Sequence, residues 1–327
     1  MSTETKVDLE NFMVSASPHI RCDESISRIM WSVNAALAPA ALFSIYNFGM
    51  PALLTMILCI GAALATEYLI LKWQEKPMVV NDGSAFLTGL LLAMNIPATL
   101  PWYMPILGSV FAIGIAKHTM GGLGFNIFNP ALIGRASILA SWPVAMTTWP
   151  LSKDMIGKVD GLTAATPLGI LKLEGYQKVV EHFGSAATMY KDMFLGVRSG
   201  SMGETSALLL ILGGIFLIYK GYIKWQVPVL MIGTVGVLTA AFGGDPFLHM
   251  MSGGLILGAF YMATDMVTIP ITTKGQIIFA VGAGALTVLI RLQGGYPEGV
   301  CYAILLMNCV TPLIDRLVRP VKYGARR

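Results

Sequence analysis

The chain has 327 residues, of which 55% are hydrophobic and 12% are charged, and its mean hydropathy is +0.68. This is too little polar surface to coat a soluble globule of that length, so the composition excludes a soluble protein and predicts an integral membrane protein. The formal net charge is only +4. The positions of the basic residues along the chain are therefore more informative than their sum, and we expect no nucleic-acid partner.

The N-terminal segment, residues 1–28, lacks a basic region followed by an apolar core and a small-residue cleavage site. We therefore expect a polar cytoplasmic tail rather than a signal peptide. The cysteines and histidines are scattered, without metal-ligand spacing and without a Ser/His/Asp or Cys/His grouping. We expect no disulfide, no metal site and no catalytic residues of those classes.

A membrane-spanning helix needs about 20 mainly apolar residues, and the hydrophobic runs predict about ten such helices in two groups of five. The first group precedes a long polar segment and the second group follows it. The predicted helices cover residues 29–47, 52–72, 84–97, 102–117, 127–146, 204–219, 226–243, 248–264, 275–292 and 298–315.

Residues 147–203 form the long polar segment between the two groups. One stretch within it, ILKLEGYQKVVEHF (170–183), mixes apolar and charged residues as an amphipathic helix does. The pattern therefore predicts a small extramembrane unit between a first transmembrane repeat (29–146) and a second (204–315). A basic tail, residues 316–327, closes the chain.

The basic residues predict the orientation of these helices. If the N-terminus is cytoplasmic, the short cytoplasmic segments contain nearly all of the Lys and Arg, and the short outer connections contain almost none. That asymmetry is typical of membrane proteins with this orientation. Five helices precede the 147–203 loop, so we expect the loop outside the membrane and both termini in the cytoplasm.

An internal repeat supports this arrangement. The segment LLLAMNIPATLP (90–101) is similar to AFYMATDMVTIP (259–270). An offset of 169 residues superposes Pro101 on Pro270, an offset of 170 superposes Asn95 on Asp265, and one inserted residue reconciles the two. The first segment is expected to run outward and the second inward. The fold class predicted is thus an all-α membrane protein of two inverted-topology five-helix repeats, in which interrupted helices commonly surround a site near the midplane.

Polar residues within the apolar runs carry a cost and invite a functional explanation. Arg135, Asp265 and Asn95 are three of them. One interpretation is that such residues bond backbone groups freed where prolines interrupt helices. The other is that Asp265, Arg135 and Asn95 line an ion or cofactor pathway, because an unpaired charge in hydrocarbon is expensive.

The outer loop contains the stretch DGLTAATPLG (160–169). Asp160 and Gly161 favour a chain reversal, and Thr163 or Thr166 could cap a helix entered through Pro167. A threonine hydroxyl is also a phosphoryl acceptor, and the small residues around it would let a bulky group approach. The residues alone leave both interpretations open.

Several stretches along nearly the whole chain together resemble the RnfD membrane subunits of the Rnf complexes, the ion-translocating ferredoxin:NAD⁺ oxidoreductases. A more distant resemblance is to the B subunit of the Na⁺-translocating NADH:quinone reductases. The stretches occur in family order: SPHIR (17–21), FNPALIGR (128–135), DGLTAATPL (160–168), GETS (203–206), GAFYMATDMVTIPITTKG (258–275) and GGYPEGVCYAILLMNCVTPLID (294–315).

The resemblance implies a covalent FMN. In that family a flavin transferase joins FMN through its phosphate to the last threonine of an Asp-x-x-Ser/Thr-Gly-Ala-Thr motif, which is Thr166 here. Asp160, Thr163 and Ala165 fit the motif, whereas Ala164 replaces the usual glycine. The resemblance also allows a riboflavin held noncovalently among the helices, to which the sequence assigns no residues.

The function implied is that of an electron-transfer subunit in the cytoplasmic membrane of a prokaryote. Its expected partners are the other Rnf subunits, including a second subunit with a covalent flavin, while Na⁺ or H⁺ crosses the membrane. Ferredoxin and NAD⁺ are expected to bind elsewhere, because this chain lacks iron–sulfur ligands and a dinucleotide fingerprint. The alternatives are a quinone-reductase B subunit and a flavin-free secondary transporter or channel.

Overall fold

The computed structural model describes residues 24–150, 163–196, 199–204 and 206–319. The described part is helical except for one antiparallel pair of two-residue strands, β1 (Trp149–Pro150) and β2 (Thr163–Ala164). Trp149 pairs with Ala164 and Pro150 pairs with Thr163, so the chain just before residue 151 lies beside the chain just after residue 162. Asp160, the first residue of the expected attachment motif, lies outside the described residues.

Residues 24–150 form the first half of the chain. A proline begins α5 directly after Asn129, whose side chain accepts hydrogen bonds from the first backbone N–H groups of the helix, an N-cap that satisfies donors otherwise left unpaired. The elements are α1 (Ile26–Phe48), α2 (Met50–Trp73), the 3₁₀ turn η2 (Val80–Asp82), α3 (Ser84–Met94), α4 (Tyr103–Val110), the π-helical η3 (Phe111–His118), α5 (Pro130–Ser141) and α6 (Pro143–Thr147).

The described residues 163–196 contain three short helices, α7 (Pro167–Glu174), α8 (Tyr176–Phe183) and α9 (Ala186–Leu195), which we call the loop unit. The single amphipathic helix predicted for residues 170–183 is wrong, because Gly175 has a φ of 88° and separates α7 from α8. The three helices bury a small apolar core of their own. That core also contains Leu248 of the second half, so the loop unit packs onto the membrane part.

The second half contains η5 (Met202–Glu204), α10 (Ala207–Tyr219), α11 (Gln226–Ala241), α12 (Pro246–Met251), α13 (Leu255–Leu257), the π-helical η6 (Gly258–Met262), α14 (Thr273–Gln293) and α15 (Val300–Leu317). The continuous helix predicted over 248–264 is wrong. Gly253 and Gly254 have φ values of 68° and 65° and interrupt it. Likewise, the helix predicted over 127–146 is divided before Pro143.

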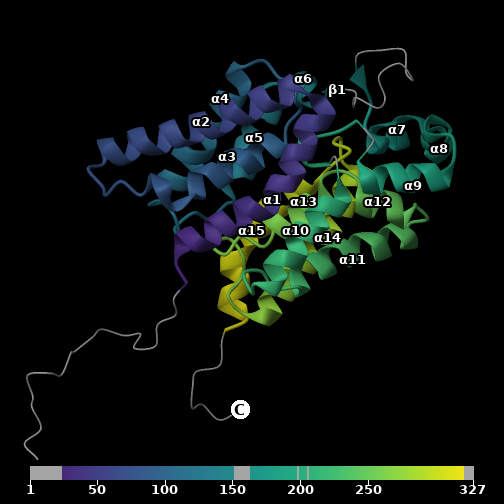
Figure 1. The fold of residues 1–327 in the computed structure, drawn as a ribbon. Helices are drawn as coiled ribbons and strands as arrows, with labels where there is room; N and C mark the ends of the chain where they lie inside the picture. The colour runs from purple at the N-terminus through teal and green to yellow at the C-terminus, as the bar shows by residue number, and fades with distance from the viewer. Residues whose placement is uncertain (1–23, 151–162, 197–198, 205, 320–327) are drawn as a thin grey trace, which may run out of the picture.

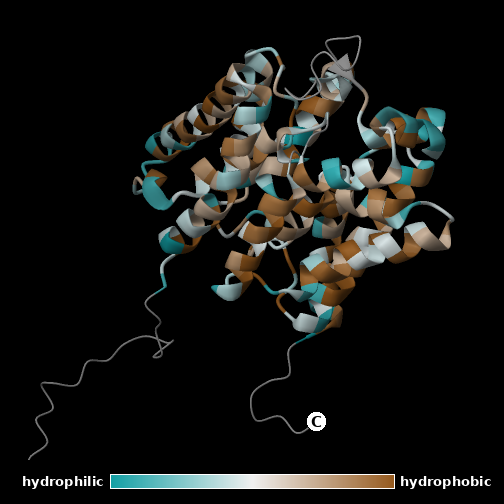
Figure 2. Cartoon of the chain, turned by 45° about the vertical axis from the view of Figure 1, so that its right-hand side comes forward, coloured by the Kyte–Doolittle hydropathy of each residue, from teal (hydrophilic) through white to brown (hydrophobic). Residues whose placement is uncertain are grey.

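The protein is a multi-pass membrane protein. Among the described residues, four helices are long and apolar enough to cross a membrane: α1, α2, α14 and α15. Helices α3, α10 and α11 are shorter but also apolar. Figure 2 shows apolar helices through the body of the molecule, with hydrophilic residues gathered at the ends and on α7–α9.

The two halves meet along α1, α10, α5 and α15. Helix α1 packs on α10, and α5 packs on α15. The start of α1 and the end of α15 lie at the lower side of Figure 1, whereas α7–α9 lie at the upper right. The large apolar core runs through both halves, and the outer loop covers one end of their interface.

Candidate functional site

Thr166 is the N-cap of α7. Its backbone is extended, and its Oγ1 accepts a hydrogen bond of 3.1 Å from the Gly169 N–H. Pro167 occupies the first helical position, which suits its fixed φ. The prediction that Thr166 could cap a helix is therefore confirmed. The side chain is 4% exposed, so it lies in an enclosed wall rather than on the open surface.

The wall belongs to a cavity of about 300 Å³. Ala165 and Thr166 line one side, and α5 and α15 line another through Arg135 and Cys301. Among its lining residues Leu173 is exposed, whereas Arg135 and Cys301 are buried. The cavity thus lies between the start of α7 and the place where α5 packs on α15.

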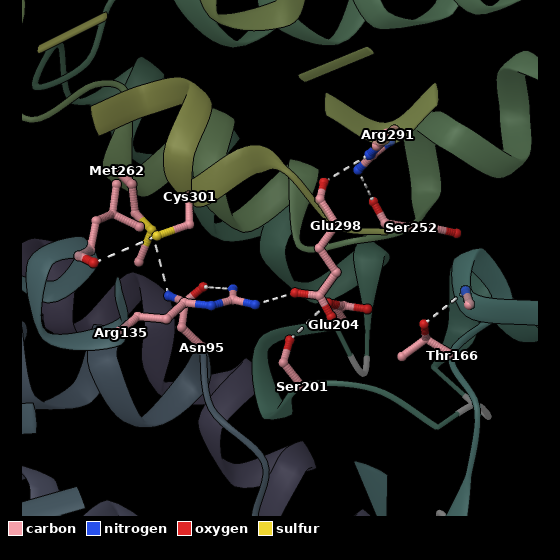
Figure 3. A network of polar contacts seen from close by, with 12 residues as sticks. Asn95, Arg135, Thr166, Ser201, Glu204, Ser252, Met262, Arg291, Glu298 and Cys301 are labelled. Carbon is pink, nitrogen blue, oxygen red and sulfur yellow. Dashed lines mark hydrogen bonds and ion pairs between the residues drawn. The ribbon is translucent and has the colours of Figure 1, made fainter. Parts of the chain in front are cut away.

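Arg135 and Glu298, which both line this cavity, form a buried ion pair. Nη2 of Arg135 donates to Oε2 of Glu298, and Nη1 donates to Asn95 Oδ1 at 3.2 Å. Figure 3 shows the guanidinium of Arg135 directed toward the Glu298 carboxylate, with Asn95 beside it. Within the described structure, Arg135 Nε and Glu298 Oε1 are buried without hydrogen-bond partners.

Arg291 holds the loop that carries Glu298. Its guanidinium donates to the Glu298 carbonyl at 2.9 Å, the His249 carbonyl at 2.6 Å and the Ser252 carbonyl at 2.8 Å. His249 belongs to α12, and Ser252 follows the end of that helix. The interruption between α12 and α13 therefore supplies backbone carbonyls as acceptors for the buried guanidinium of Arg291. Arg291 therefore fixes Glu298 to both α14 and α12 (Figure 3).

The two predicted helix breaks contact each other. Asn95 follows α3, and its Nδ2 lies 3.5 Å from the sulfur of Met262 at the end of η6. Asn129 Nδ2 donates to the Met262 carbonyl at 3.4 Å. Asn95 and Arg135 are thus brought together, as the pathway interpretation requires.

Asp265 lies in a different place. Its carboxylate accepts hydrogen bonds from the Val267 N–H at 3.3 Å and the Thr268 hydroxyl at 3.4 Å. It lines a second cavity of about 90 Å³ between the halves, together with Asn126, Lys117 and Phe260. The structure therefore separates Asp265 from the Arg135 pair, although the break at Met262 connects their surroundings.

Lys117 is one of the basic residues expected on the cytoplasmic side, but its side chain is only 2% exposed. Its ammonium lies 2.7 Å from Glu67 Oε1 and 2.7 Å from the Ser84 hydroxyl. A buried pair of this kind compensates two charges that would each be costly alone. Lys117 also lines the second cavity, so a charged group reaches that space from the first half.

Sequence reasoning missed Glu298, Arg291 and Glu67 as buried partners. Glu298 stands in the loop stretch YPEG, where an acidic residue indicates solvent, and Arg291 is expected as a charge near an outer helix end. The pattern of hydrophobic residues does not indicate that Glu298 pairs with Arg135, 163 residues away, or that Glu67 pairs with Lys117, 50 residues away. The described residues contain no group of three or more His, Cys, Asp or Glu side chains able to hold a metal.

Comparison with known proteins gives one family. Residues 13–324 match the model of the NQR2, RnfD, RnfE family. The chain is 63% identical to the D subunit of the proton-translocating ferredoxin:NAD(+) oxidoreductase complex of Clostridium ljungdahlii, with 99% of each chain covered. It is 47% identical to the D subunit of the Na(+)-translocating ferredoxin:NAD(+) oxidoreductase complex of Acetobacterium woodii, covering 97% of this chain and 96% of that one.

A third relative is the D subunit of the ion-translocating oxidoreductase complex of Stutzerimonas stutzeri, which is 42% identical over 92% of both chains. The alignments with all three relatives run over nearly their full length, so they include both halves and the outer loop.

Proposed function

Because the chain belongs to the NQR2, RnfD, RnfE family, we propose that it is the electron-carrying membrane subunit of an Rnf-type ion-translocating ferredoxin:NAD⁺ oxidoreductase. It is one subunit of an enzyme complex, and we expect NAD-linked activity on another subunit. The observation that carries the proposal is that Thr166, the expected flavin attachment site, lines a cavity large enough to accept part of a planar cofactor.

The residues around Thr166 fit a covalent FMN. A phosphoester formed at Oγ1 leaves an oxygen that can still accept from the Gly169 N–H, so attachment and helix capping are compatible. The N-terminus of α7 favours negative charge nearby, and Ala165 at the cavity edge leaves room beside the threonine. When bound, the flavin supplies chemistry of one or two electrons, while the chain supplies attachment and position.

The partners follow from this assignment. A flavin transferase would modify Thr166, with Asp160, Thr163 and Ala165 in its recognition motif. Leu173 in the cavity lining is exposed, which suits electron exchange with a second subunit that carries a covalent flavin. We place this loop, residues 147–203, outside a prokaryotic cytoplasmic membrane and both termini inside it.

The fold we propose is ten transmembrane helices in two repeats of inverted topology, with interrupted helices counted as single spans. The packing supports it: α2 contacts α3 and α4 in the first half as α11 contacts α12 and α14 in the second. Equivalent helices also meet across the interface, α1 with α10 and α5 with α15. Cys301 Sγ lies 3.5 Å from the Leu132 carbonyl, at the repeat offset of 169 residues.

We assign the ion pathway to the interface that contains Asn95, Arg135 and Asp265. Both helix breaks end there, and the backbone groups they free are polar within an apolar surround. For a noncovalent riboflavin the second cavity is the better candidate, because it offers the amides of Asn126 and Asn129 beside the ring of Phe260.

The test is mass spectrometry of the complex purified from its native membrane. An FMN-sized adduct is expected on the peptide that contains Thr166. The variant Thr166→Asn should lose the adduct while retaining the helix cap, because asparagine is also a good N-cap residue. Thr163→Ala serves as the matched control and should keep Thr166 modified, although to a lower extent if the motif residue aids recognition.

An unmodified Thr166 in active, assembled complex would reject the covalent flavin. Loss of ferredoxin-linked activity with retained quinone reduction would favour the quinone-reductase B subunit. Complete absence of bound flavin from an active complex would favour a secondary transporter. The variant Ala164→Gly tests the departure from the motif, since higher modification in that variant would show that Ala164 limits the transferase.

A further inference from the structure

The wall of the Thr166 cavity contains a second feature, a buried ion pair with unsatisfied polar atoms. Arg135 is 5% exposed and Glu298 is 9% exposed. Both side chains line the cavity, yet Arg135 Nε and Glu298 Oε1 have no hydrogen-bond partner within the described structure. A buried donor and a buried acceptor left unpaired each cost free energy, so they call for a ligand or a specific function.

The charges of this pair lie where a flavin on Thr166 would meet them. The pyrimidine edge of an isoalloxazine ring gains electron density on reduction, so charges beside it affect its reduction. Arg135, Glu298 and Thr166 all line one cavity, whereas the unpaired Arg135 Nε and Glu298 Oε1 are enclosed by protein and do not open onto it. The aromatic side chains of Trp149 and Tyr302 also line it and would contact the apolar part of a planar ring.

We infer that the buried Arg135–Glu298 ion pair, which lines the same cavity as Thr166, sets the reduction potential of the flavin attached at Thr166. The inference rests on the proposed covalent attachment. Arg135 and Glu298 would therefore have a role beyond holding α5 against α15.

The neutrality of the pair is central to its effect. A cation beside the polar edge of the ring stabilises added electron density, and an anion destabilises it. In the native pair the two charges are bonded to each other, so their effects partly cancel. Removing one charge should leave the other facing the ring in a site of low dielectric, where charges act strongly.

The pair is also held rigidly, as a tuning function requires. Asn95 accepts from Arg135 on one side, and Arg291 binds the Glu298 carbonyl on the other. The Glu298 side chain is held in turn by Arg135 itself. The ring would therefore meet a preformed pair of charges.

The experiment is a redox titration of the purified complex, compared with the same complex carrying Thr166→Asn, so that the difference isolates the Thr166 flavin. Arg135→Gln should shift the midpoint to lower potential, and Glu298→Gln should shift it to higher potential. We expect each variant to change the ratio of oxidised to reduced flavin at the native midpoint at least tenfold, about 30 mV for a two-electron couple.

Two further variants keep the test decisive. Arg135→Lys retains the charge and should shift the midpoint less than Arg135→Gln does. Asp245→Asn removes one carboxylate outside the cavity while keeping an N-cap for α12, and it should leave the midpoint unchanged. Each sample is checked for the flavin adduct and for complete subunit assembly before titration.

Opposite shifts in Arg135→Gln and Glu298→Gln would support the inference, because a purely structural role predicts no such reversal of sign. Unchanged midpoints, or shifts in the same direction, with the adduct present would overturn it and leave the covalent attachment intact. Absence of the adduct from the native complex would instead reject the proposed function itself. If Arg135→Gln fails to assemble, Glu298→Gln still decides: a shift to higher potential, larger than any shift in Arg135→Lys, supports the inference, and an unchanged or lower midpoint overturns it.

Discussion

At Thr166 one hydroxyl meets two requirements. It caps α7 through the Gly169 N–H, and it lines the cavity that Arg135 also lines. The two uses do not compete, since an ester oxygen can still accept a hydrogen bond. A capping function in the structure is therefore no argument against modification at the same atom.

Asp265 provides a prediction at the scale of one residue. Its two carboxylate oxygens each accept one weak hydrogen bond, Oδ1 from the Val267 N–H and Oδ2 from the Thr268 hydroxyl. In asparagine the oxygen could still accept from the Val267 N–H, and the amide group could donate to the Thr268 hydroxyl oxygen. Asp265→Asn should therefore leave assembly intact but slow ion-coupled turnover, at least tenfold if the charge carries the ion. Ion uptake and NAD⁺ reduction are measured together in proteoliposomes.

Val267→Ala is the control for Asp265→Asn, because Val267 lines the same cavity but carries no charge. It should retain coupling close to that of the native complex. Normal coupling in Asp265→Asn would remove Asp265 from the ion pathway, whereas loss of assembly in that variant would indicate a structural function for the carboxylate.

At the scale of elements, interruptions organise the site. The break between α12 and α13 turns carbonyls toward Arg291, which in turn holds the loop of Glu298. The break after α3 presents Asn95 to Arg135. A continuous helix through the second break would keep its carbonyls in the helical hydrogen-bond ladder and deprive Arg291 of backbone acceptors.

Gly253 gives a prediction for such an interruption. Its φ is 68°, and an added Cβ would lie 2.6 Å from Arg291 Nη2 and 2.7 Å from a methyl of Leu168. Gly253→Ala should therefore destabilise the complex by about 1–2 kcal/mol from backbone strain alone, and more if Arg291 is displaced. The thermal midpoint of the solubilised complex is measured at a fixed scan rate.

Gly295→Ala is the matched control, since a Cβ there meets open space and no left-handed φ is required. Its midpoint should stay within error of the native value. If the thermal midpoint of Gly253→Ala equals that of Gly295→Ala, the helix break tolerates a side chain and the Arg291 guanidinium can move away from the added Cβ.

At the scale of the whole molecule, helices α7–α9 lie on the opposite side from the start of α1 and the end of α15. Helices α7–α9 pack through Leu168 and Leu248 onto the end of the second half that is remote from the start of α1 (Figure 1). Tyr190 of α9 also donates its hydroxyl to Asp245, and this bond raises the pKa of Tyr190. The loop unit is therefore attached to α12 by both apolar and polar contacts.

The proposed orientation predicts a labelling pattern. Lys178 on α8 and Lys76 after α2 are both exposed. A membrane-impermeant thiol reagent should label Lys178→Cys in right-side-out vesicles and Lys76→Cys only in inverted vesicles. The native chain in the same vesicles gives the background from its own cysteines, and the reverse pattern would contradict the assigned topology.

Much of the molecule was predictable from local patterns. The apolar runs correctly predicted the long helices α1, α2, α14 and α15, because a segment in lipid must be apolar throughout. The motif stretches correctly predicted the family. Pro167 after Thr166 correctly predicted a helix start, since capping depends on neighbours a few residues apart.

Other features depended on contacts that no local pattern encodes. The breaks at Gly175 and Gly253 were missed because the flanking residues remain compatible with a helix on both sides. Lys117 and Glu67 were not recognised as a buried pair, because a charge near the end of an apolar run is usually exposed.

The sequence by itself determined that this is a membrane protein and which family it belongs to, and it left Thr163 and Thr166 as the two candidates for the cap of a helix entered through Pro167. Hydrophobicity, motif order and capping are properties of the chain over short distances. Only the tertiary structure decided that Thr166, Arg135 and Glu298 share one cavity. Arg135 and Glu298 are 163 residues apart, and they meet because α5 packs on α15. That packing depends on the shapes of whole helices, which no single stretch of residues records.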